Sequence, residues 1–262
     1  MVDGVDAGFS RKAAVYDAYC ASNAAVQWSL GIIRTKVLQV LPAGGGGSIL
    51  EINAGTGRDA AWFAERGHCV HATDIAAGMV AEIERKISTG RFAGRLTCER
   101  VSFNDLSTEK FDLIFSNFGG LNCAHDLRAV CSLFRPRLNP HGYVVLVVMP
   151  RICPWELVQV FRGRLGVATR RLGTNGTIAN VEGARVPTRY FSAGYLNACL
   201  GDAFEILELR SLGLVSPPSF MEGFPRRWPM LFAALARVDA RVGTWPLARG
   251  WGDYMVLSAR LK

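Results

Sequence analysis

The chain lacks the sequence features of several protein classes. Its longest apolar run, Tyr143 to Met149, is far shorter than the roughly 18 residues that a membrane-spanning helix needs, so we expect no membrane partner. Its seven cysteines are odd in number and form no Cys-x-x-Cys pair, so we expect no metal site and no disulfide framework. The first residues contain acids and no apolar stretch, unlike a secretion signal. These absences predict a cytoplasmic protein.

Acidic residues are scarce in one part of the chain. Residues 1–150 carry 15 Lys and Arg against 14 Asp and Glu, whereas residues 151–262 carry 15 against 8, and 14 of those 15 are Arg. Arginine binds carboxylates and phosphates through two hydrogen bonds, which favours an anionic substrate or partner. The alternative is a general preference for Arg over Lys in this composition, and both interpretations remain open.

A glycine-rich segment gives the strongest indication of function. Residues 49–57, Ile-Leu-Glu-Ile-Asn-Ala-Gly-Thr-Gly, predict a buried strand, a tight turn and the start of a helix, and the next strand ends at Asp74. This is how an α/β sheet builds a nucleotide pocket: Gly55 and Gly57 allow close approach of the backbone, and Asp74 can accept hydrogen bonds from a ribose diol. Because Gly55 to Ala60 also fits G-x-G-x-x-A, a dinucleotide is one candidate ligand.

Residue order elsewhere favours a single α/β domain. Residues 10–41 are predicted to be helical with a break near Ser22–Asn23, and from residue 48 strands and helices alternate. That alternation is typical of a mostly parallel sheet with helices on both faces. The predicted strands are 48–53, 68–73, 95–101, 111–117, 143–149, 204–212 and 251–261, with a turn at 139–142, and the predicted helices are 58–66, 77–88, 126–138 and 190–200.

Several motifs resemble class I S-adenosylmethionine-dependent methyltransferases of the small-molecule type. The segment 51–57 resembles their E/D-x-G-x-G-x-G pattern, with Asn53 in place of the first glycine; Asn is the residue after Gly that best tolerates a positive φ. Residues 74–79 resemble their D-I-S-x-x-M segment, and 111–117 their fourth strand. Residues 9–17 resemble an N-terminal element whose Tyr covers the cofactor, and 251–261 resemble their last, antiparallel strand.

The resemblance implies a Rossmann-like seven-stranded sheet and S-adenosylmethionine as cofactor. It further implies one domain over 1–262, with an N-terminal helical cap at 1–43, a cofactor-binding core at 48–150 and the last strand at 251–262. Two long segments, 151–200 and 214–250, interrupt the alternation, and long loops are usually functional. We expect them to form a lid or hood over the substrate; extra packing at the sheet edge is the alternative. The first contains a Gly, Thr and Asn-rich stretch at 173–177.

The resemblance also assigns roles to individual residues. Asp74 would bind the ribose, Ile75 and Met79 would flank the adenine, and the cofactor's ammonium would meet backbone carbonyls near Asn53 and Asn117. The polar partner of the adenine stays open between Ser102, the Phe103 backbone N–H and Asp105. The expected cofactor-binding residues are Tyr16, Glu51, Asn53, Ala54, Gly55, Gly57, Asp74, Ile75, Met79, Ser102, Phe103, Asn117 and Phe118.

Candidates for catalysis are few. A base is needed only if the nucleophile arrives protonated. His125, after the fourth strand, has the right chemistry for proton transfer, although a surface His beside the helix start at Asp126 explains it as well. Tyr16 is the second candidate, as a substrate contact or a cover over the cofactor.

The leading hypothesis is methyl transfer to an O or N atom of a small molecule, anionic or aromatic, and a homodimer is compatible with it. An RNA-modifying methyltransferase is the first alternative. Nucleic acid is nevertheless not an expected partner, because Asn117 is followed by Phe-Gly-Gly and no separate RNA-binding module is visible. A dinucleotide-dependent oxidoreductase and a non-catalytic descendant of the fold are the remaining alternatives.

Overall fold

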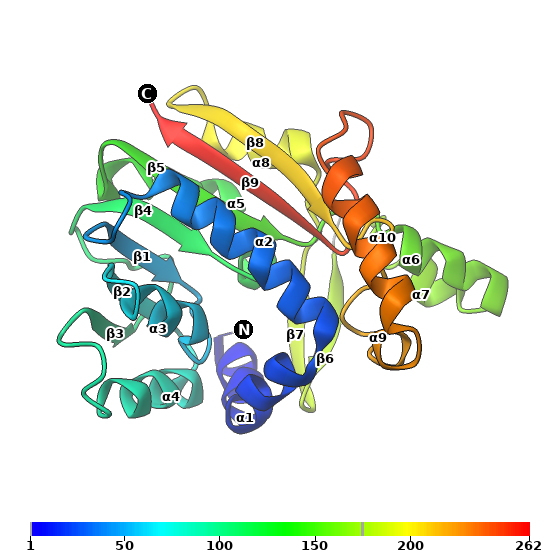
Figure 1. Cartoon of the computed structure of the whole chain (residues 1–262), viewed down its shortest axis with the longest axis horizontal. Coiled ribbons are helices and arrows are strands. Elements are labelled where there is room, and N and C mark those ends of the chain that lie inside the picture. Colours follow the sequence, from blue (N-terminus) through cyan, green and yellow to red (C-terminus); the bar gives the residue numbers. More distant parts are fainter. Residues whose placement is uncertain (1, 174–175) are drawn as a thin grey trace.

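The computed structural model describes residues 2–173 and 176–262, which form a seven-stranded sheet and a separate two-stranded hairpin (Figure 1). The strand order is β3-β2-β1-β4-β5-β9-β8, in which β1 to β5 are parallel and β9 is antiparallel to both of its neighbours. This is the Rossmann-like sheet predicted from the sequence. The strands are β1 (Ser48–Ile52), β2 (Cys69–Asp74), β3 (Leu96–Arg100), β4 (Phe111–Ser116), β5 (Leu138–Val148), β8 (Phe204–Leu212) and β9 (Tyr254–Leu261).

Both faces of the sheet are covered by helices. Side chains alternate along each strand, so Ile49 packs in the core under α2, α3 and α4, whereas Leu50 packs in the core under α5 and α8. The central strands β1, β4, β5 and β9 therefore contribute to both hydrophobic cores, in keeping with their near-continuous apolar sequences. These helices are α2 (Ala24–Val40), α3 (Arg58–Ala64), α4 (Ala77–Ile87), α5 (Leu127–Ser132) and α8 (Ala193–Leu200).

The predicted break in the N-terminal helical region is confirmed. Helix α1 (Val2–Ser22) ends one residue before Asn23, and Asn23 is the N-cap of α2. Its side-chain oxygen accepts hydrogen bonds from the backbone N–H groups of Ala25 and Val26, at 3.1 and 3.2 Å. An Asn cap satisfies N–H groups that have no partner within the helix, which explains why a new helix starts here.

Two predicted boundaries around β5 were wrong. Helix α5 ends at Ser132 rather than 138, because Pro136 cannot continue a helix; it lies in the short 3₁₀ helix η2 (Arg135–Arg137). Residues 139–142, predicted as a turn, belong to β5 as a bulge. Phe111 pairs with Leu138 and Leu113 with Tyr143, so the extra residues of β5 are absorbed between these two pairs.

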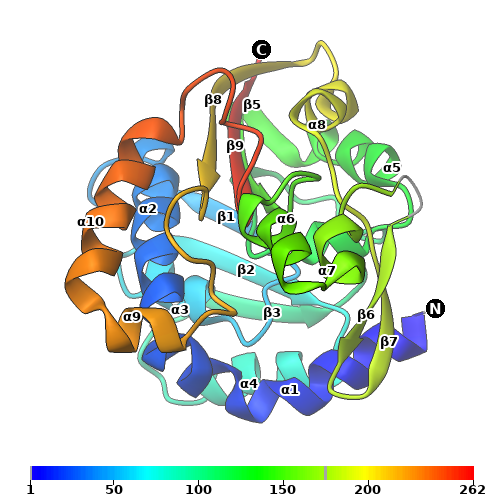
Figure 2. The same cartoon turned by 90° about the vertical axis from the view of Figure 1, so that its right-hand side faces the viewer.

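The segment after β5 contains structure that the sequence did not reveal. It forms α6 (Pro154–Leu157), the 3₁₀ helix η3 (Val158–Arg162), α7 (Leu165–Thr169) and a hairpin of β6 (Thr177–Val181) and β7 (Ala184–Thr188). Part of the Gly, Thr and Asn-rich stretch, residues 174–175, lies outside the described residues. Figure 2 shows α6 and α7 in front of the carboxyl-terminal edge of the sheet.

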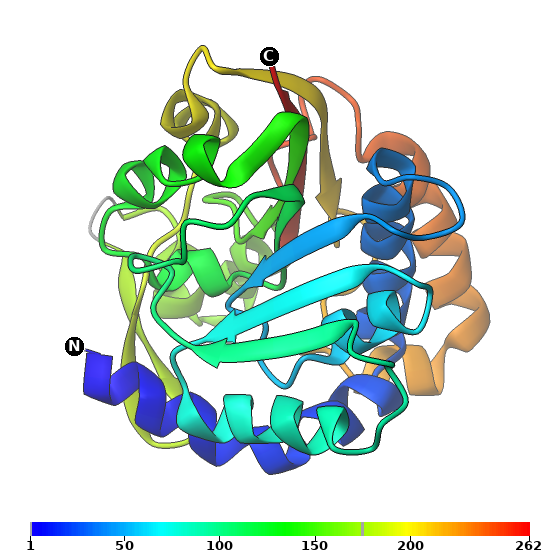
Figure 3. The same cartoon turned by 90° about the vertical axis from the view of Figure 1, so that its left-hand side faces the viewer.

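The segment between β8 and β9 forms α9 (Gly223–Arg227) and α10 (Pro229–Val242). Helix α10 contacts β8 and the short helix α9 contacts α2, so this segment lies at the β8 edge of the sheet (Figures 2 and 3). The buried carboxylate of Asp239 in α10 accepts hydrogen bonds from the backbone N–H groups of residues 213–216, which fixes the loop after β8. Among the described helices, none is both long enough and apolar enough to cross a membrane.

Candidate cofactor and active site

The glycine-rich turn joins β1 to α3 at the centre of the carboxyl-terminal edge. Asn53, Gly55 and Gly57 all have positive φ, at 49°, 58° and 69°, so the left-handed conformation expected at Asn53 is confirmed. A Cβ atom on Gly57 would lie 2.8 Å from Ile83 of α4, so a glycine is required there for close packing as well as for φ. The turn therefore has the backbone form of a nucleotide-binding loop.

Asp74 lies directly against this turn. Its two carboxylate oxygens accept hydrogen bonds from the backbone N–H of Gly55 at 2.8 Å and of Ala76 at 2.9 Å. Burial raises the pKa of Asp74, and these hydrogen bonds oppose that shift. Because a carboxylate has about four acceptor positions, two remain for a ligand such as a ribose diol.

Buried polar atoms without partners cluster at the start of the turn. In residues 2–173 and 176–262, no hydrogen-bond partner is found for Glu51 Oε2, Asn53 Nδ2, or Nε and Nη1 of Arg58. Buried polar groups are almost always paired, so unpaired ones suggest a missing ligand. The guanidinium of Arg58 suits a carboxylate, and backbone carbonyls near Asn53 and Asn117 suit an ammonium. These residues therefore fit the amino-acid part of S-adenosylmethionine.

Glu51 supports the turn rather than opening into it. Its side chain is 2% exposed and accepts a hydrogen bond from the backbone N–H of Ala60, in the first turn of α3. Burial first, and then the neighbouring Asp59 carboxylate, hold the pKa of Glu51 well above its usual range. Glu51 at this position anchors the start of α3 below the turn.

The loop after β4 is tied to the same helix start. Asn117 donates a hydrogen bond to Asp59 at 2.7 Å and accepts one from the Phe118 N–H at 2.7 Å. Arg34 of α2 in turn holds Asp59, at 2.7 Å. Asp59 and Arg58 were not among the predicted residues, although both directly follow Gly57 in the motif.

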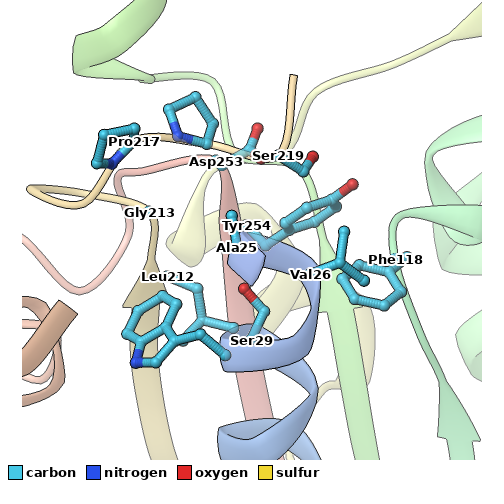
Figure 4. Close-up of a pocket in the computed structure, with 12 residues that line it drawn as sticks. Ala25, Val26, Ser29, Phe118, Leu212, Gly213, Pro217, Ser219, Asp253 and Tyr254 are labelled. Carbon is cyan, nitrogen blue, oxygen red and sulfur yellow. The ribbon is translucent and has the colours of Figure 1, made fainter. Parts of the chain in front are cut away.

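Phe118 has a positive φ of 45°, a strained conformation for a residue with a large side chain. Its ring meets the Tyr254 ring edge-on, with 5.3 Å between centroids, and the Arg58 guanidinium lies 5.7 Å from its centroid. Figure 4 shows Phe118 and Tyr254 with Ser29 around a small cavity between α2 and the loop after β8. At about 10 Å³ this cavity has room for about one water molecule, so it does not hold a substrate.

Helix α1 lies across the turn and is bonded to it. Asp17 accepts a hydrogen bond from the Thr56 hydroxyl at 2.5 Å and pairs with Lys86 at 2.7 Å. Near the other end of α1, the Asp6 carboxylate accepts a hydrogen bond from the Ala77 N–H at the start of α4, at 2.9 Å. A Cβ atom on Gly78 would lie 2.7 Å from the backbone of Ser10, so the two helices are in close contact, as Figure 3 shows.

Tyr16 is placed next to the turn by α1. The Arg58 guanidinium lies 6.0 Å from its ring centroid, and burial raises the pKa of its hydroxyl. The hydroxyl therefore stays protonated near neutral pH and can donate a hydrogen bond but cannot act as a base. His125 is exposed, immediately before the N-cap of α5, Asp126.

The remaining predicted residues surround Asp74. Met79 is buried with Phe9, Ala13 and Ala76 beneath α1, and Ile75 is half-buried. Ser102 Oγ accepts a hydrogen bond from the Asn104 N–H at 3.2 Å, and Phe103 packs against the core under α5. Asp105 is exposed, and the choice among these adenine contacts stays open.

Cys123, in the 3₁₀ helix η1 (Gly120–Cys123), lies near Asp74 and was not among the predicted site residues. Burial, and then the Asp74 carboxylate, raise the pKa of the Cys123 thiol to about 11.

Comparisons with known proteins agree with this geometry. The family profile described as "Methyltransferase domain" matches residues 49–142, from β1 to the start of β5. Residues 49–142 therefore match a methyltransferase domain, and the whole chain has the fold of S-adenosylmethionine-dependent methyltransferases. A search of curated proteins finds no match.

Several solved structures share the fold of this chain. The CcbJ methyltransferase of Streptomyces caelestis aligns with a TM-score of 0.61 at 17% identity, covering 95% of this chain and 96% of the other. An S-adenosylmethionine-dependent methyltransferase of Mesorhizobium loti gives 0.57 at 19% identity, covering 89% and 97%. The 1,6-didemethyltoxoflavin-N1-methyltransferase of Burkholderia thailandensis gives 0.57 at 17% identity, covering 99% and 88%.

Proposed function

We propose that this protein is an S-adenosylmethionine-dependent methyltransferase that acts on a small molecule, at an O or N atom. The proposal rests on one observation: helix α1 is held by hydrogen bonds to other elements on both of its sides. Asp6 and Asp17 bind it to α4 and the glycine-rich turn, and on the other side Arg11 donates a hydrogen bond to the Glu182 carbonyl of the β6–β7 hairpin at 2.8 Å. A carboxyl-terminal edge covered in this way suits a compact substrate better than a polymer.

In the proposed site, Asp74 binds the ribose and Arg58 binds the carboxylate of the cofactor. When bound, S-adenosylmethionine supplies an activated methyl group. Asp59 is a positioning residue, because it holds Asn117 and hence the loop beside the reacting centre. Tyr16 covers the site and donates a hydrogen bond, and His125 remains the candidate proton acceptor for a nucleophile that arrives protonated.

Two solved structures with small-molecule substrates support this proposal. The Burkholderia thailandensis enzyme contains bound 1,6-didemethyltoxoflavin and S-adenosylhomocysteine. A geranyl diphosphate C-methyltransferase from Streptomyces coelicolor, 12% identical with a TM-score of 0.57, contains geranyl diphosphate. We also propose a cytoplasmic location, on the odd number of scattered cysteines.

The test begins with calorimetric titration of S-adenosylmethionine, S-adenosylhomocysteine and NADH. We expect the two sulfur compounds to bind and NADH not to bind, and Asp74→Ala to weaken binding at least tenfold, since it removes a buried acceptor. Asp202→Ala, at an exposed turn before β8, is the matched control and should bind as the wild type does.

Labelled methyl transfer to a panel of small anionic and aromatic nucleophiles, with bulk RNA as a comparison, then tests the substrate class. Transfer to RNA alone would overturn the small-molecule proposal. Failure of the unmodified protein to bind either sulfur compound would overturn the assignment of the site.

A further inference from the structure

The segment 154–172, which we name the hood tip, exposes an unusual number of apolar side chains. It comprises α6, η3 and α7, and in Figure 1 it extends away from the sheet on the right. Phe161 is 89% exposed and Leu165 is 60% exposed. Isolated exposed apolar residues are ordinary, but a cluster on one protrusion marks a binding surface. The exposed apolar residues of the hood tip are Leu157, Val158, Val160, Phe161, Leu165, Val167 and Leu172.

The hood tip is an ordered part of the fold. Its base is held by Glu156, which is 1% exposed and pairs with Arg170 at 2.6 Å and Arg171 at 2.7 Å. Arg171 also pairs with Asp253 at the start of β9, at 3.0 Å. A buried ionic network at the base fixes the direction in which the apolar residues project.

The exposed charge of the hood tip is entirely positive. Glu156 is its only acidic residue in the sequence and is buried in the network at the base. Arg162 and Arg164 are both exposed, next to Phe161 and Leu165. Within the described residues of the tip, the ion pairs involve only Arg170 and Arg171. The surface is therefore apolar with a basic border and no compensating acid.

The combination of exposed apolar residues and a basic border indicates which kind of partner the hood tip binds. In a symmetric dimer formed through the tip, Arg162 and Arg164 of one copy would meet the same residues of the other, which like-charge repulsion disfavours. An anionic lipid surface matches both properties, because apolar side chains enter the headgroup region while arginines bind phosphates.

A second basic and apolar patch lies on the same side of the molecule. Arg226, Arg227, Trp228, Met230 and Leu231, where α9 meets α10, are all exposed, with Met230 at 81%. Figure 2 shows α7 and α9 on the side that faces the viewer. Two such patches that face one direction suit a flat surface better than a compact protein partner.

We propose that the hood tip binds the surface of membranes that contain anionic phospholipids. The contact is peripheral, with Phe161 and Leu165 in the headgroup layer and Arg162 and Arg164 on lipid phosphates. It does not depend on methyl transfer, so its test is independent of the proposed function. It would bring the carboxyl-terminal edge, where the cofactor site lies, next to the lipid surface.

Sedimentation of the full chain with vesicles tests the proposal. Vesicles of phosphatidylcholine alone are compared with vesicles that also contain phosphatidylglycerol, at low and high salt. We expect binding only to the anionic vesicles and weakening of binding as salt rises. Arg162→Gln with Arg164→Gln should reduce the partition coefficient by about 25-fold, since each basic residue contributes about 1 kcal/mol at such a surface.

The apolar contribution is tested by Phe161→Ser with Leu165→Ser, for which we expect at least a tenfold loss. Leu247→Ser is the matched control, because Leu247 is 87% exposed but lies outside the hood tip. Unchanged melting temperatures verify that each variant is folded. Equal binding to neutral vesicles, no binding to anionic vesicles, or equal losses in the control and the tip variants would overturn the proposal. Concentration-dependent dimerisation that the tip variants abolish would also overturn it, with a second copy as the occupant.

Discussion

Replacement of Arg171 by Met is the most direct test of how the hood is held on the sheet. The Arg171 side chain is 4% exposed and lies between two buried carboxylates, Glu156 at 2.7 Å and Asp253 at 3.0 Å. It also donates a hydrogen bond to the Asp253 carbonyl at 3.0 Å. Met matches the aliphatic stem of Arg, so the substitution keeps the packing of the stem while it removes the charge and the hydrogen bonds.

The expected loss of stability depends on the buried carboxylates that remain after Arg171 is replaced. Glu156 keeps Arg170, but Asp253 becomes a buried carboxylate without a cation. Breaking one partner of a buried ion pair costs about 3–5 kcal/mol, and the remaining Arg170 pair favours the lower value. For a chain of this size, 1 kcal/mol corresponds to about 2–4 °C, so the melting temperature should fall by about 10 °C.

Thermal unfolding followed by circular dichroism measures this change. Arg170→Met is the matched control: Arg170 pairs with the same glutamate but is 41% exposed, so its loss should cost about 1 kcal/mol or less. Adding Asp253→Asn to Arg171→Met should recover part of the loss, since it removes the unpaired charge. Similar small shifts for both single variants would refute the argument that burial makes this network costly to break.

Two further predictions concern the glycine-rich turn. Arg58→Met should weaken S-adenosylmethionine binding at least tenfold in calorimetry, while 5′-methylthioadenosine, which lacks the amino-acid part, should bind equally well to both proteins. A loss for both ligands would instead indicate a general disruption of the turn. For Glu51, the pKa in the folded protein is raised, so the folded state binds its proton more tightly than the unfolded chain does. Stability should therefore fall as pH rises above the ordinary glutamate pKa of about 4.3, and Glu51→Gln should gain stability relative to the wild type over the same range; parallel urea-unfolding curves across pH would contradict this.

The sheet was predictable because its signals are local. The buried strands β1, β2 and β4 and the glycine-rich turn each occupy fewer than ten residues, and β8 was predicted with its observed bounds. The β6–β7 hairpin was missed because Pro187 argues against a strand in β7. Helix α10 carried a signal that was not used: Pro229 is at its first position, followed by strong helix formers.

The site was predictable only in its motif residues. Asp74 is placed against the turn as the motif implies, but Asp59 and Asp17 act through partners that are distant in sequence, Asn117 and Thr56. The direction of a side chain such as Phe118, which turns toward Tyr254, depends on a strained backbone angle that composition and spacing do not encode.

Asn53 departs from the family pattern, and the structure shows how the turn accommodates it. Its Oδ1 atom accepts a hydrogen bond from the Ser116 hydroxyl at 3.0 Å, and a Cβ atom on Gly120 would collide with its amide. The space for the larger side chain therefore comes from a glycine in the loop after β4, while the backbone of the turn keeps its left-handed form. Since Asn53 Nδ2 has no partner among the described residues, the substitution adds a buried donor beside the site instead of closing it. Asn53 thus fits the left-handed turn, and Gly120 leaves the space for its side chain.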